Sequence, residues 1–92
     1  MALEVLEMRL LRNKRRGRTL GERIRDERED RDISQQNLAK DIGITPGMMS
    51  QIEGDKRDPS LEVFRKIVRK LEVSSDFLLG FSEVKKIKED ER

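Results

Sequence analysis

The sequence of 92 residues contains no cysteine, histidine, tryptophan or tyrosine, and it has only three phenylalanines. The lack of cysteine excludes a disulfide framework, a thiolate nucleophile and a thiolate metal site. Histidine is the commonest general base and metal ligand, so its absence excludes a zinc site or a serine triad of the usual type. These absences argue against an enzyme, and we expect neither a cofactor nor a bound metal.

Long apolar runs are also absent. No stretch approaches the roughly 18 apolar residues of a membrane span. Residues 1–18 lack the apolar segment and the small-residue cleavage site of a signal peptide. We therefore expect a cytoplasmic protein with no membrane association.

Charged residues make up 43% of the chain, and their distribution is uneven. Residues 1–19 hold six Lys or Arg and two Glu, whereas residues 20–92 hold fifteen Lys or Arg and seventeen Asp or Glu. The positive excess lies in a block that contains Lys14, Arg15, Arg16 and Arg18. Such blocks often contact nucleic acid, although most are simply solvated tails.

Apolar residues recur at spacings of three and four and never alternate for long, which predicts helices and leaves no room for a sheet. At this length we expect one small domain with an arm or tail outside its core. We predict an amphipathic helix and basic arm over residues 1–18, an all-α domain over residues 19–80 and a charged tail over residues 81–92, where the helical pattern can continue. In the first segment three leucines at helical spacing form one apolar stripe: Leu3, Leu6 and Leu10. Such a stripe is more typical of a packing or self-association surface than of a cofactor site.

Five helices are predicted between residues 19 and 80 from the residues that begin and end them. Hydroxyl side chains suited to N-cap positions precede the apolar patterns: Thr19, Ser34, Thr45, Ser60, and Ser74 or Ser75. Gly43 and Gly80 suit the left-handed residue that follows a helix, and Pro46 suits a first helical position. The helix after Ser60 is expected to turn five apolar residues inward: Leu61, Phe64, Ile67, Val68 and Leu71.

The segment from Gln35 to Gly54 has the pattern of a helix-turn-helix, two helices at a steep angle joined by a short turn with glycine. Apolar residues are expected to face the core from both helices, with a small residue where they cross: Leu38, Ala39, Ile42, Met49 and Ile52. The second helix, about Pro46–Glu53, has an outward face of small or polar residues: Thr45, Gly47, Ser50, Gln51 and Gly54. A helix that enters a DNA major groove needs such a face.

These residues resemble the lambda-repressor-like, Cro/C1-type (XRE-like) helix-turn-helix domains over Thr19–Gly80. The matching pieces occur in order: Ile33–Ala39, Gly43–Thr45, Met49–Glu53, Asp58–Glu62 and Leu71–Gly80. The resemblance implies a compact five-helix domain that binds double-stranded DNA, usually as a homodimer on a two-fold-symmetric operator, in a prokaryotic or phage-encoded intracellular protein. It further implies a transcriptional regulator, which we expect to be a repressor that occludes a promoter.

The resemblance also implies roles for single residues. Gln35 matches a glutamine that bonds a phosphate and braces the recognition helix, and Gln51 matches a base-reading position, where glutamine suits adenine. Arg28 and Glu53 match a structural ion pair of some relatives. The full set of expected DNA-binding residues is Gln35, Gln36, Thr45, Pro46, Gly47, Ser50, Gln51, Lys56 and Arg57.

Pro46 and Gly47 depart from the family pattern, because many relatives carry long base-reading side chains at these two positions. Either Gly47 lets the helix approach the bases or a thymine methyl closely, or direct readout is thin and DNA shape supplies the rest. We hypothesise that the basic arm, with Lys14, Arg15, Arg16 and Arg18, adds backbone contacts as homeodomain arms do.

Two alternatives to a plain repressor stay open. One is a protein-interaction module such as an autoregulatory antitoxin, which the stripe Leu3–Leu11 and the segment Phe81–Ile87 would serve as a partner surface. The other is a restriction–modification controller. Phe81, Val84 and Ile87 either seal a dimer interface or belong to a tail. The operator, the target genes and whether the chain is part of a longer regulator are not readable from these residues.

Overall fold

The computed structural model describes residues 19–82, and they form five helices and no strand. In chain order the helices are α2 (Leu20–Asp30), α3 (Gln35–Ile42), α4 (Pro46–Glu53), α5 (Leu61–Leu71) and α6 (Ser75–Leu79). This confirms the all-α, five-helix prediction for the domain. The expected first helix, the basic arm and the end of the tail, including Val84 and Ile87, lie outside the described residues.

Side-chain N-caps begin all five helices, as predicted. At α2, the Thr19 hydroxyl accepts from the Glu22 N–H at 3.2 Å and the Glu22 carboxylate accepts from the Thr19 N–H at 3.0 Å, which is a complete capping box. The remaining caps are Ser34, Thr45, Ser60 and Ser74. Each such cap stabilises its helix by about 1 kcal/mol, so the helix starts are strongly encoded locally.

The turn between α3 and α4 depends on one left-handed residue. Gly43 has φ 80°, and it lets the N–H of Ile44 return to the carbonyl of Ala39 at 2.9 Å. Three residues, Gly43 to Thr45, connect the two helices, and Thr45 is the N-cap of α4. The helix-turn-helix geometry therefore follows from this glycine and the cap beside it.

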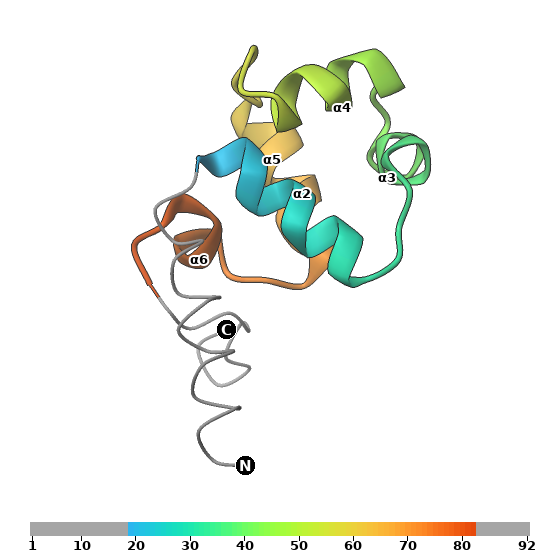
Figure 1. Ribbon diagram of the computed structural model, residues 1–92. Helices are drawn as coiled ribbons and strands as arrows, with labels where there is room; N and C mark the ends of the chain where they lie inside the picture. The colour runs from blue at the N-terminus through green and yellow to red at the C-terminus, as the bar shows by residue number, and fades with distance from the viewer. Residues whose placement is uncertain (1–18, 83–92) are drawn as a thin grey trace.

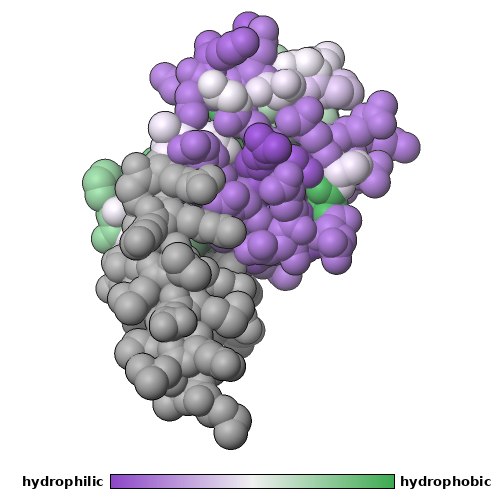
Figure 2. All heavy atoms as spheres, viewed as in Figure 1, coloured by the Kyte–Doolittle hydropathy of each residue, from purple (hydrophilic) through white to green (hydrophobic). Residues whose placement is uncertain are grey.

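The core lies where α2, α3, α4 and α5 meet, with α6 packed on α2. Figure 1 shows α2 crossing in front of α5, with α4 above them and α3 seen along its axis. The buried apolar side chains come from all five helices and the segment before α6: Ile24, Leu38, Ala39, Ile42, Met49, Ile52, Ile67, Leu71, Val73 and Leu78. Figure 2 shows that the described residues on the face seen in Figure 1 are largely hydrophilic. Within residues 19–82 no helix is long and apolar enough to cross a membrane.

The expected inward face of α5 is wrong at Leu61. Leu61 is 66% exposed, whereas Ile67 and Leu71 are fully buried, and Val63 packs against the core instead. Leu61 is the first residue of α5, and helical side chains lean toward the N-terminus. At that position no turn of the helix precedes it, so the side chain extends past the end of α5 and stays exposed.

Candidate nucleic-acid interface

Helix α4 presents two contrasting faces. Met49, Ile52 and Glu53 are buried against the domain, at 0%, 1% and 5% exposure. Five of the sequence-predicted DNA-binding residues lie on the opposite, exposed face: Thr45, Pro46, Gly47, Ser50 and Gln51. The structure thus brings these residues together on one helix, while the hydroxyl of Thr45 is already engaged in capping the N–H of Met48 at 3.0 Å.

The other predicted residues flank this helix. Gln35 and Gln36 open α3, with Gln36 exposed and Gln35 partly buried. Lys56 and Arg57 are exposed in the loop after α4, where the Lys56 N–H donates to the Gln51 carbonyl at 2.8 Å. The arm residues Lys14, Arg15, Arg16 and Arg18 lie outside the described residues.

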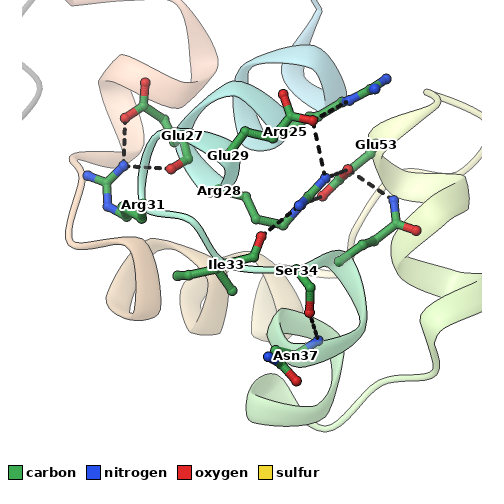
Figure 3. A network of polar contacts seen from close by, with 10 residues as sticks. Arg25, Glu27, Arg28, Glu29, Arg31, Ile33, Ser34, Asn37 and Glu53 are labelled. Atoms are coloured by element: carbon green, nitrogen blue, oxygen red, sulfur yellow. Dashed lines mark hydrogen bonds and ion pairs between the residues drawn. The ribbon is translucent and has the colours of Figure 1, made fainter.

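A buried ion pair holds α4 in place. Arg28 donates from Nε to Oε2 of Glu53 at 2.8 Å and from Nη2 to Oε1 at 3.1 Å, and the two side chains are only 9% and 3% exposed. Arg28 also donates from Nη1 to the Ile33 carbonyl at 2.7 Å, and Gln35 donates from Nε2 to Oε1 of Glu53 at 3.0 Å. Figure 3 shows Arg28 of α2 and Glu53 of α4 meeting close to Ile33, in the segment before α3. One carboxylate therefore fixes three helices relative to one another.

The hydrogen bonds that Arg28 donates to Glu53 raise the pKa of Arg28 above its ordinary value. Burial opposes this shift, and the negative charges of Glu53 and Glu29 add to it. A raised pKa on a cation adds stability that is present below the unfolded pKa and is lost only as the pH rises through the folded one. For arginine that loss falls in strongly alkaline solution. The contribution of Arg28 is therefore constant across the physiological range.

A second contact joins the end of α4 to the start of α2. Oδ1 of Asp55 accepts from the Gly21 N–H at 3.0 Å, and its other carboxylate oxygen accepts from the Thr19 hydroxyl. A Cβ on Gly21 would lie 2.6 Å from the Glu53 carbonyl oxygen and closer still to that of Ile52. Only glycine permits this approach of α2 to α4.

Gly21 and Asp55 were not identified from the sequence. A glycine inside a predicted helix is a weak signal of close packing, and Gly21 could have been noticed on that ground. Asp55 sits in a loop at φ 59°, and nothing local distinguishes it from its charged neighbours. Both residues position α4 through contacts between segments that are far apart in the sequence.

The described residues offer an exposed helical surface on α4. Among them no group of three or more carboxylates is placed to hold a metal ion. An α-helix with its side chains is about 10–12 Å across, and the major groove of B-DNA is about 12 Å wide. A helix with one exposed face of small and polar residues, held rigidly from behind, matches that groove in size.

Comparisons with known proteins point in the same direction. A family model described as "Helix-turn-helix" matches residues 24–78. The HTH-type transcriptional regulator ImmR of Bacillus subtilis (strain 168) is 34% identical over 68 residues, which covers 74% of this chain and 54% of ImmR. The chain spans about half the length, or less, of the curated relatives it matches.

Two solved structures share the arrangement of helices. The P22 c2 repressor, in complex with a synthetic operator, superposes with a TM-score of 0.67 at 32% identity, covering 71% of this chain and 98% of that one. The N-terminal DNA-binding domain of SinR from Bacillus subtilis superposes with a TM-score of 0.60 at 30% identity, covering 64% and 87%. These relatives are regulators and repressor domains, and none of the three is an enzyme by its description.

Proposed function

The chain belongs to the helix-turn-helix family of Cro/C1-type, lambda-repressor-like domains, and from this premise we propose that it is a sequence-specific DNA-binding transcriptional repressor. One observation carries the proposal. Helix α4 exposes a face of small and polar residues and is held from behind by the buried Arg28–Glu53 pair. A helix that reads bases must be rigid, because hydrogen bonds to base edges tolerate little displacement.

In the proposed complex α4 enters the major groove with its exposed face toward the bases. Gln51 is exposed, and its amide can bond both N6 and N7 of an adenine. Ser50 offers a hydroxyl beside it. Gln35 and Gln36, at the start of α3, lie where the helix crosses the DNA backbone in this motif. Bonding of Gln35 to Glu53 would then couple phosphate contact to the position of α4.

We further propose that the protein acts as a dimer on a two-fold-symmetric operator, with half-sites one helical turn, about 34 Å, apart. Leu79, the last residue of α6, and Phe81, two residues beyond it, are 42% and 80% exposed, and a protein contact would remove both apolar side chains from water. A second copy of the chain is the occupant we propose. By binding as a dimer in the cytoplasm, such a repressor would occlude a promoter.

Phosphate contacts are proposed to come partly from outside the described domain. Residues 19–82 carry eleven Lys or Arg and thirteen Asp or Glu, so this part of the chain is slightly negative. Lys56 and Arg57 are the cations nearest the end of α4 in sequence. The arm residues Lys14, Arg15, Arg16 and Arg18 would supply the remaining positive charge needed against the DNA backbone.

The same exposed apolar pair, Leu79 and Phe81, would serve one second candidate equally well, an interaction module that binds a different protein and uses its DNA affinity for autoregulation. Selection from a random duplex DNA pool separates the two. Enrichment of an inverted repeat with half-sites about one turn apart supports the dimeric repressor. If no sequence is enriched and binding is weak and strongly salt-sensitive, the dimeric repressor is contradicted and the interaction module is favoured.

A further inference from the structure

Gly47 is a glycine that the fold itself does not require. It is exposed, it is the second residue of α4 and its φ is not in the left-handed region. A Cβ built on Gly47 would have one neighbour within 4 Å, the Thr45 hydroxyl oxygen at 3.9 Å, which is an ordinary van der Waals contact. Gly21 is the opposite case, because a Cβ there would collide with backbone carbonyls.

Glycine is also unfavourable for α4. It loses more conformational freedom on folding than alanine does, and it weakens a helix for that reason. An alanine at position 47 would fit the domain and would favour the helix. The domain therefore gains neither a turn nor a close packing contact from this glycine.

We propose that Gly47 is a specificity-determining residue. Because it has no side chain, the edge of a base that carries a methyl group, such as thymine, can lie directly against the backbone of α4. This inference rests on the proposed function. A Cβ would project about 1.5 Å from the backbone into that contact. The helix would have to withdraw by a comparable distance, or the base pair at that position would have to change.

Withdrawal would also affect Gln51. Gly47 and Gln51 are four residues apart and share one face of α4. A hydrogen bond of about 2.9 Å that lengthens by about 1.5 Å is no longer a hydrogen bond. Adding a side chain at Gly47 and removing the side chain of Gln51 should therefore weaken DNA binding in part through the same lost hydrogen bond. Their effects on the free energy of binding should be less than additive.

The test compares stability and DNA affinity in Gly47→Ala and Gly47→Leu, using the full chain and the duplex selected by the unmodified protein. We expect the melting temperature of Gly47→Ala to rise by about 2–6 °C. Its Kd for the selected duplex should rise by about tenfold or more, and that of Gly47→Leu further. In a Gln51→Ala background, Gly47→Ala should cost less than it does alone.

Glu72→Gly provides a matched control for stabilisation. Glu72 is exposed after α5 with φ 55°, where glycine removes backbone strain. This variant should also melt at a higher temperature while its Kd stays within twofold of the unmodified protein. Stability alone then does not explain a loss of binding in Gly47→Ala.

Each outcome decides the inference. A higher melting temperature with reduced affinity supports it. A higher melting temperature with unchanged affinity overturns it and leaves the repressor function intact. A lower melting temperature also overturns it, because the fold would then need the glycine. Failure of the unmodified protein to select any duplex refutes the proposed function itself, which is a separate result.

Discussion

Removing the carboxylate of Glu53 is the most severe test of how α4 is held. Glu53→Ala leaves the Arg28 guanidinium, 9% exposed in its side chain, without the two hydrogen bonds that it makes at 2.8 and 3.1 Å. The side-chain amide of Gln35 loses its acceptor as well. Arg28 keeps its bond to the Ile33 carbonyl, which does not neutralise a charge, and the half-exposed Glu29 carboxylate at 3.9 Å, which does so only weakly.

The expected loss is large relative to the stability of a domain this small. Breaking a buried ion pair by removing one partner costs about 3–5 kcal/mol, because the other charge stays buried without its buried partner. A domain of this size has a free energy of unfolding of roughly 3–10 kcal/mol. Glu53→Ala should therefore lower the melting temperature by at least about 12 °C or leave the domain unfolded.

Circular dichroism at 222 nm during urea and thermal unfolding measures this, since the chain has no tryptophan or tyrosine for fluorescence. Glu29→Ala is the matched control, because Glu29 lies 3.9 Å from Arg28 but is 51% exposed. We expect that control to change the free energy of unfolding by less than about 1 kcal/mol. If Glu53→Ala costs no more than Glu29→Ala, the Arg28–Glu53 pair does not hold α4 and the reasoning fails.

Three further predictions concern the other contacts. Gly21→Ala should lower the free energy of unfolding by about 1–3 kcal/mol, because the new Cβ would collide with the carbonyls of Ile52 and Glu53. An unchanged midpoint of urea unfolding would contradict the close approach of α2 to α4. Gln51→Ala should weaken binding to the selected duplex by about 1–3 kcal/mol and relax the base preference at one base pair per half-site. An equal loss of affinity for every duplex sequence would rule out base reading by Gln51. Deleting residues 1–18 should make the slope of log K against log salt shallower by up to about 3–4, whereas an equal slope would exclude the arm as a phosphate contact.

The helix boundaries could be predicted because local chemistry determines them. Thr19, Ser34, Thr45 and Ser60 each cap the backbone of their own helix, and Gly43 takes the left-handed conformation that its turn requires. These contacts span a few residues, so a pattern in the sequence is enough. Leu61 was misjudged because periodicity gives the direction of a side chain but not where the helix ends relative to the core.

The contacts that position the candidate interface were only partly predictable. An arginine at an inward helical position, Arg28, needs a buried acceptor, and the family resemblance supplied Glu53 as its partner. Gly21 and Asp55 depend on α2 and α4 meeting at one point, although they are separated by more than thirty positions in sequence. No local pattern encodes that meeting. Which exposed residues of α4 contact DNA stays a prediction for the same reason, because the partner determines it.

The central claim is that α4 is the helix that reads DNA, and an NMR titration of the isotope-labelled chain with its selected duplex tests it most directly. The account predicts that the largest shift changes fall on Gly47, Ser50 and Gln51, with smaller ones at Gln35 and Gln36. Signals of α6 should be less affected at a fixed oligomeric state. Changes concentrated on α5 or α6, with α4 unaffected at saturation, would contradict the account.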